Sequence, residues 1–178
     1  MVLSKNMQKL VAGSSTIRKL FEEGIELAKE VGAENVYDFS LGNPAAPVPE
    51  EVKKSIYDIL ENRNANFVHC YMPNAGYPEV REKVAANLNK KYNSSFTKDD
   101  IIMTVGAAGV INCVLRSLLE PEDEVLCFAP FFGEYNSYVM NFGGNLKVVP
   151  ADYETFQLNV EEADKYITER TKAVIINN

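Results

Sequence analysis

Residues 101–109, Ile101-Ile102-Met103-Thr104-Val105-Gly106-Ala107-Ala108-Gly109, form the most informative stretch of the sequence. Its first five residues form an apolar run typical of a short buried strand, and the small residues that follow predict a turn. Residues 110–119 then continue as an apolar helix. A strand that passes through a tight turn into a helix favours an α/β protein with a parallel sheet.

Downstream of this stretch the same alternation repeats. Strands are predicted over residues 124–129, 146–149 and 173–176, and helices over residues 133–142 and 160–167. Strands that alternate with helices require crossover connections, which place helices on both faces of the sheet. We therefore predict an α/β fold of three αβα layers around a mainly parallel sheet.

Upstream of the stretch, helices are separated by irregular segments. Helices are predicted over residues 16–31, 49–62 and 78–92, a short strand over 36–41, and irregular structure over 42–47 and 63–77. Ser14 or Ser15 could cap the first of these helices. An amphipathic helical arm thus precedes the α/β part.

The composition argues against several classes of partner. The chain has 178 residues, and 18 Lys+Arg against 25 Asp+Glu give a net charge of −7. Nucleic acids and anionic membrane surfaces attract clustered basic residues, which this chain lacks. Its apolar runs are also far shorter than the roughly 20 residues of a membrane-spanning helix. We expect neither a nucleic-acid partner nor a membrane partner.

Metal binding and cysteine chemistry are not expected either. The sequence has one histidine, His69, and three widely spaced cysteines, Cys70, Cys113 and Cys127. A zinc site takes about four ligands. His69 and Cys70 are adjacent, so on an extended backbone their side chains point to opposite faces and make a poor nucleophilic pair. Unpaired thiols and an N-terminus without a secretion signal predict a cytoplasmic protein.

Two local features could bind a ligand, and each has a plain structural alternative. The backbone N–H groups of Gly106, Ala107 and Ala108 could hold a phosphate together with the helix dipole. Neither a P-loop nor a G-x-G-x-x-G pattern is present, so an ordinary tight turn is the alternative. Phe131 and Phe132 follow the next strand, where ligands of open sheets bind, and could stack on a flat ring or pack in the core.

Five motifs, taken in order, resemble the class I/II aminotransferases, which are pyridoxal-phosphate enzymes of fold type I. They occupy residues 39–44, 71–81, 104–108, 130–132 and 173–178, and residues 74–81 form the most specific part. The resemblance implies the αβα large domain of these enzymes, with an N-terminal helical arm before it. Residues 1–47 would form the arm and part of a small domain, and residues 48–178 the first part of the large domain.

The resemblance also implies a cofactor site. Gly106, Ala107 and Ala108 match the residues whose N–H groups hold the phosphate of pyridoxal 5'-phosphate, and Phe132 matches the aromatic residue that stacks on its pyridine ring. Many relatives have Ser, Thr or Lys at the position of Ala108. Contact with the phosphate through the backbone alone is therefore expected here.

Two further residues match positions outside this cofactor cradle. Gly42 corresponds to a glycine beside the substrate carboxylate, and Tyr71 to a tyrosine that reaches the phosphate of the neighbouring subunit in a homodimer. The implied reaction moves an amino group between an amino acid and a 2-oxo acid.

No residue of this chain matches the catalytic lysine of the family, the aspartate that pairs with the pyridine nitrogen, or the arginine that binds the substrate carboxylate. We therefore assign no catalytic residue within residues 1–178 and expect the activity to belong to a longer protein. Two alternatives are a carbon–sulfur lyase on the same fold, which would not need an oxo-acid acceptor, and a non-catalytic fragment that lacks the lysine.

Overall fold

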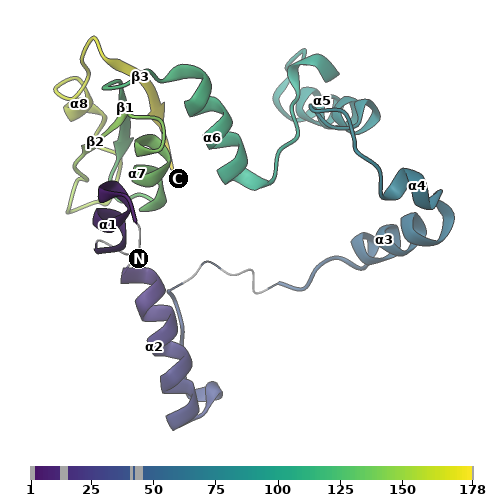
Figure 1. The fold of residues 1–178 in the computed structure, drawn as a ribbon, viewed down its shortest axis with the longest axis horizontal. Helices are drawn as coiled ribbons and strands as arrows, with labels where there is room; N and C mark the ends of the chain where they lie inside the picture. Colours follow the sequence, from purple (N-terminus) through teal and green to yellow (C-terminus); the bar gives the residue numbers. More distant parts are fainter. Residues whose placement is uncertain (1–2, 13–15, 41, 43–45, 178) are drawn as a thin grey trace. The chain divides into compact units, whose positions relative to one another are not determined.

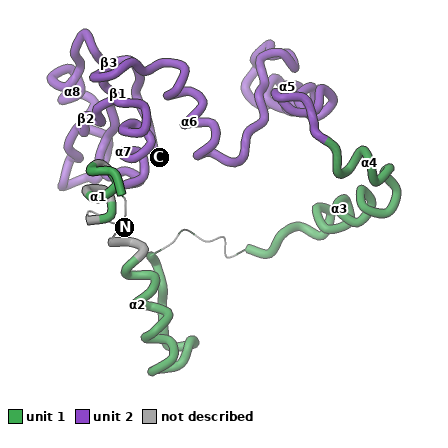
Figure 2. The backbone as a smooth tube through the Cα atoms, viewed as in Figure 1, with its two compact units in different colours: residues 1–70 green, residues 71–178 purple. Residues whose placement is uncertain are grey.

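The computed structural model describes residues 3–12, 16–40, 42 and 46–177 (Figure 1). The chain divides into two compact units, Met1–Cys70 and Tyr71–Asn178 (Figure 2). The expected cap at Ser14 or Ser15 and residues 43–45 of the expected loop lie outside the described residues. The boundary expected between residues 47 and 48 stays a prediction, and it would fall within the first unit.

The first unit is helical. Its elements are α1 (Lys5–Ala12), α2 (Thr16–Val31), the 3-10 helix η1 (Ala33–Asn35), α3 (Glu50–Asn62) and α4 (Ala65–Val68). Helices α2 and α3 confirm two predicted helices. Helix α4 is a single turn in a segment predicted to be irregular, and the Asn64 side chain caps it by accepting a hydrogen bond from the Asn66 N–H at 2.8 Å.

The strand predicted over residues 36–41 is wrong over residues 36–40, the part that the structure describes. The carboxylate of Asp38 accepts a hydrogen bond from the N–H of Ser40 at 2.8 Å. Such a local bond satisfies a backbone donor that a strand would direct to a neighbour. The described residues of this unit include no strand with which the segment could pair.

The second unit contains the sheet. Its elements are α5 (Pro78–Tyr92), η2 (Lys98–Asp100), α6 (Gly106–Leu118), β1 (Glu124–Phe128), α7 (Glu134–Met140), β2 (Asn145–Val149), α8 (Val160–Ala163) and β3 (Thr171–Ile175). Strand β1 pairs in parallel with β2 on one side and β3 on the other, so the sheet order is β2-β1-β3. This topology confirms the predicted parallel sheet and its crossovers.

Strand β1 is buried along its whole length because helices cover both faces of the sheet. Alternate residues of a strand point to opposite faces, and β1 accordingly contributes to two apolar clusters. One consists of Leu115, Leu119, Val125 and Val139, and the other of Leu126, Phe128, Val149 and Ala163. Helix α7 and the carboxyl-terminal end of α6 therefore lie on one face and α8 lies on the other, which confirms the three-layer αβα architecture (Figure 1).

The strand predicted over residues 101–105 is wrong, because this run belongs to no sheet ladder. Ile102 and Val105 are 68% and 94% exposed. The N–H of Met103 instead donates to the carbonyl of Ala75 at 3.0 Å. An apolar run becomes a strand only beside a partner strand, and the described residues provide none for it.

The helix predicted over residues 160–167 is shorter than expected, since α8 ends at Ala163. The N–H groups of Lys165 and Tyr166 donate to the carbonyls three residues earlier, those of Glu162 and Ala163. Bonds of this spacing tighten the chain into turns rather than continuing an α-helix. None of the helices in the described part of the chain combines the length and apolar character needed to cross a bilayer.

Candidate functional site

The first candidate feature is the phosphate turn, which we define as Gly106, Ala107 and Ala108 at the start of α6. Gly106 has φ +67, a backbone conformation that a residue with a side chain rarely adopts. A Cβ at this position would meet nothing within 4 Å, so the outside of the turn is open. No side chain caps the helix, because the N-cap residue is Val105.

The phosphate turn has two free N–H groups. Those of Ala107 and Ala108 have no acceptor among the described residues, as the first turn of a helix leaves its donors without partners. The N–H of Gly106 is different, because it donates to the carbonyl of Thr104 at 3.1 Å. Of the three donors expected, two are therefore available, and both lie at the positive end of the α6 dipole.

Thr104 stabilises the conformation of the phosphate turn through two contacts. Its hydroxyl donates to the carbonyl of Gly106 at 3.1 Å. A Cβ on Gly109 would lie 3.3 Å from Cβ of Thr104, so the threonine side chain packs directly against the first turn of α6. These contacts hold the backbone of the turn in a shape suited to an anion such as a phosphate monoester.

The second candidate feature lies at the carboxyl ends of two neighbouring strands, β1 and β3. Phe132, which follows β1, is 46% exposed, and its ring contacts Tyr135 edge to face with centroids 5.7 Å apart. The Tyr135 hydroxyl donates a hydrogen bond of 3.3 Å to Oδ1 of Asn177, the residue that lies just after β3. The Phe132 ring is thereby held at the sheet edge with surface free for stacking on a flat ring.

Tyr71 is fully exposed, and the space beside Gly42 is open. Tyr71 is 102% exposed and makes no hydrogen bond or ring contact with any residue that the structure describes. Gly42, in the first unit, has nothing within 4 Å of the position of a Cβ. Within the second unit, no hydrogen bond among the described residues joins Tyr71 or Phe132 to the phosphate turn.

Two ionisable groups of the second unit have shifted pKa values that fit structural roles. The N–H groups of Glu154 and Thr155 bind the Asp152 carboxylate at 2.9 and 3.1 Å and lower its pKa, so this group anchors the loop after β2. Burial raises the pKa of the Cys127 thiol within β1, which keeps the sulfur protonated and unreactive. The described residues contain no cluster of three or more His, Cys, Asp or Glu that could hold a metal ion.

Three residues received no role from the sequence: Tyr135, Asn177 and Arg81. Tyr135 and Asn177 meet across 42 positions of the chain, and only the sheet order brings them together. Arg81 binds backbone carbonyls near the run that leads to the phosphate turn. Its position three residues after Pro78, in the most specific motif, was the available signal.

Comparison with known proteins relates the chain to one enzyme family. Residues 33–178 match the family described as aminotransferase class I and II. An aspartate aminotransferase from Pyrococcus abyssi is 36% identical over 92% of this chain and 40% of its own length. Aromatic-amino-acid aminotransferase 2 from Thermococcus litoralis is 36% identical over 99% of this chain and 43% of its own length.

Solved structures agree with this relationship. An amino transferase from Eubacterium rectale matches the structure with a TM-score of 0.92 and 38% identity, over 100% of this chain and 45% of that chain. A single mutant of the Thermus thermophilus aspartate aminotransferase matches with a TM-score of 0.83 and 28% identity, again over 100% and 45%. The chain spans less than half the length of each of these relatives. Since both the family match and the fold cover most of its residues, the chain belongs to the class I and II aminotransferases.

Proposed function

We propose that this chain forms part of a pyridoxal-phosphate-dependent aminotransferase, which moves an amino group between an amino acid and a 2-oxo acid. The observation that carries the proposal is the open phosphate turn, with two free N–H groups at the start of α6, in a chain of this family. Relatives named as aspartate and aromatic-amino-acid aminotransferases support an acidic or aromatic amino donor.

The residues of the turn fit the phosphate of the cofactor. The N–H groups of Ala107 and Ala108 would bind phosphate oxygens, and the α6 dipole would favour its negative charge. Gly106 allows the backbone to turn with its φ of +67, and because it has no side chain, the phosphate can approach the turn from outside. When bound, pyridoxal phosphate supplies the electron sink that amino-group transfer needs.

The remaining site residues would orient the cofactor and the substrate. Phe132 would stack on the pyridine ring, held by Tyr135 at the sheet edge. Gly42, which has no side chain, would let the substrate carboxylate approach the backbone closely. None of these groups transfers a proton, so we assign them binding and orientation.

We further propose that the active protein is a cytoplasmic homodimer in which Tyr71 completes the site of the partner subunit. Its side chain is fully exposed, and an aromatic ring with a polar tip is typical of an interface residue. In the same proposal, residues 1–47 form the arm with part of the small domain, and residues 48–178 begin the cofactor-binding domain.

The test is an assay of the native gene product. We expect it to bind pyridoxal phosphate and to form an oxo acid from aspartate or an aromatic amino acid only when 2-oxoglutarate is present. Release of ammonia or pyruvate without an acceptor would instead indicate a lyase. Residues 1–178 expressed alone serve as the control, and we expect no turnover above that of free pyridoxal phosphate, because the chain has no match to the catalytic lysine.

A further inference from the structure

The run of residues 101–105, which leads into the phosphate turn, is held by α5 and the loop before it. The run pairs with no strand of the sheet. Residues earlier in the chain hold it through a hydrogen bond from the Met103 N–H to the Ala75 carbonyl at 3.0 Å, one from the Ile101 N–H to the Lys98 carbonyl at 3.3 Å, and the contacts of Arg81 and Gly76. The position of the turn therefore depends on these contacts.

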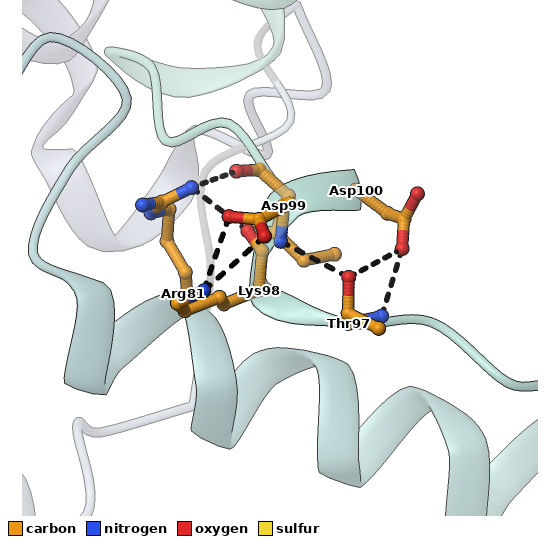
Figure 3. A network of polar contacts seen from close by, with 6 residues as sticks. Arg81, Thr97, Lys98, Asp99 and Asp100 are labelled. Atoms are coloured by element: carbon orange, nitrogen blue, oxygen red, sulfur yellow. Dashed lines mark hydrogen bonds and ion pairs between the residues drawn. The ribbon is translucent and has the colours of Figure 1, made fainter.

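Arg81 binds the start of the run. Nη1 of Arg81, from α5, donates to the carbonyl of Lys98 at 2.8 Å and to the carbonyl of Ile101 at 3.3 Å (Figure 3). These two carbonyls lie on either side of Asp99 and Asp100 in the η2 segment. A guanidinium, with donors in a rigid planar group, suits such a bridge between two acceptors.

The η2 turn is stabilised by hydrogen bonds of its own. The two bonds from Arg81 therefore also restrict the position of the backbone that follows the turn. The carboxylate of Asp100 accepts hydrogen bonds from the N–H and the hydroxyl of Thr97 at 2.8 and 2.9 Å (Figure 3). In return the Thr97 hydroxyl accepts from the N–H of Asp99 at 3.2 Å. This capping box fixes the backbone that leads directly to Ile101.

Gly76 supports the middle of the run by close contact. It is buried and has φ +95, which favours glycine. A Cβ on this residue would lie 2.7 Å from Cγ and 2.8 Å from Cβ of Met103. Any larger residue would push Met103, and with it the backbone toward Gly106, away from the loop.

We propose that Gly76 and Arg81 are positioning residues for the phosphate turn: they set where the N–H groups of Ala107 and Ala108 lie, without touching the cofactor. The inference rests on the proposed function, since it assigns the turn to pyridoxal phosphate. It also gives a physical reason for the residue types at two positions of the 74–81 motif.

The experiment compares three variants with a matched control. Arg81→Gln removes the charged guanidinium, Arg81→Lys retains a charged donor, and Gly76→Ala adds the Cβ that would contact Met103. The control is Asn89→Ala, which removes hydrogen bonds of 2.7 Å to the N–H and carbonyl of Phe96 at the other end of α5. It lowers local stability without touching residues 101–105.

Two measurements are made on the apo protein: the dissociation constant for pyridoxal phosphate and the hydrogen-exchange rate of the Met103 amide. We expect about tenfold weaker cofactor binding and faster Met103 exchange in Arg81→Gln and Gly76→Ala, a size that corresponds to losing one or two hydrogen bonds. Arg81→Lys should recover part of the affinity, and Asn89→Ala should match wild type in both measurements.

The outcomes separate the two proposals. If the wild type binds the cofactor and both Arg81→Gln and Gly76→Ala bind it equally well, the positioning role is wrong while the proposed function stands. An equal loss of affinity in Asn89→Ala would also overturn it, since general destabilisation would then be the cause. If the wild type does not bind pyridoxal phosphate, the proposed function fails and this inference fails with it.

Discussion

Oε1 of Glu124 lies 3.0 Å from the Arg170 guanidinium, which ties the first residue of β1 to the residue before β3. Oε2 accepts a hydrogen bond from the Thr168 hydroxyl at 2.6 Å, and Lys147 of β2 lies 3.4 Å from Oε1. The Glu124 side chain is 2% exposed. One buried carboxylate thus joins the amino ends of β1 and β3 to the middle of β2, at the opposite edge of the sheet from the Phe132 ring.

Replacing this carboxylate should destabilise the sheet. In Glu124→Gln the partner cations lose their charge partner, because removing one member of a buried pair leaves the others uncompensated. We expect the melting temperature to fall by about 5 °C. Lys172→Gln is the control, since Lys172 lies 3.9 Å from Asp123, a longer pair with a more exposed carboxylate that contributes little. Equal melting temperatures for wild type and Glu124→Gln would contradict the role of the pair.

The same group should make stability depend on pH. The Thr168 hydroxyl, followed by Arg170 and Lys147, holds the pKa of Glu124 below its usual value. A lowered pKa in the folded state means that the contribution is complete above the unfolded value of about 4.3 and is lost as the pH falls through the folded value. The difference in melting temperature between wild type and Glu124→Gln should therefore be constant from pH 7 to about pH 5 and shrink at lower pH. A difference that grows on acidification would rule this out.

A negative charge in the phosphate turn should separate binding from stability. Ala108→Asp places a carboxylate in the first turn of α6. There it interacts favourably with the helix dipole, which stabilises the helix, but it repels a bound phosphate. We expect the melting temperature to be unchanged or higher and the affinity for pyridoxal phosphate to fall at least about tenfold. Ala108→Asn is the uncharged control of the same shape. Titration of the apo protein with the cofactor measures the affinity of both variants, and thermal unfolding measures their melting temperatures. Equal affinities of the two variants would show that the phosphate binds elsewhere.

The Phe132 ring should contribute by stacking. Phe132→Leu retains an apolar side chain but loses the flat face, so we expect cofactor binding weaker by about threefold to tenfold. Tyr135→Phe, which removes only the hydroxyl bound to Asn177, should have a smaller effect of the same sign. Cofactor fluorescence in a titration measures both constants. A Phe132→Leu variant with wild-type affinity would assign this ring to packing alone.

Mixing two impaired variants tests whether Tyr71 acts in the partner subunit. In a hybrid dimer of Tyr71→Phe and Ala108→Asp subunits, one site receives an intact phosphate turn from its own chain and an intact tyrosine from the other. We expect hybrids to regain up to about half of the wild-type activity, because one of two sites is restored. If Tyr71 served its own subunit, both hybrid sites would carry a lesion and mixing would restore nothing.

Local patterns predicted the helices well. The predicted spans 16–31 and 78–92 coincide with α2 and α5, because apolar spacing and an N-terminal proline depend only on nearby residues. The parallel sheet was predictable for the same reason, from strands that alternate with helices. The strands predicted over residues 36–41 and 101–105 do not form over residues 36–40 and 101–105, since an apolar run records the tendency to pair but not the presence of a partner.

Most helices and the alternation that makes the sheet parallel follow from residue spacing along the chain, and the family follows from the resemblance of short motifs, because both kinds of signal are local in the sequence. The folded structure alone shows that Arg81 reaches carbonyls 17 and 20 positions away and that Tyr135 meets Asn177 across 42 positions. It also showed that the Gly106 N–H is already used by Thr104. Hydrogen bonds between distant residues depend on how helices and strands pack, and hydrophobic periodicity does not specify that packing.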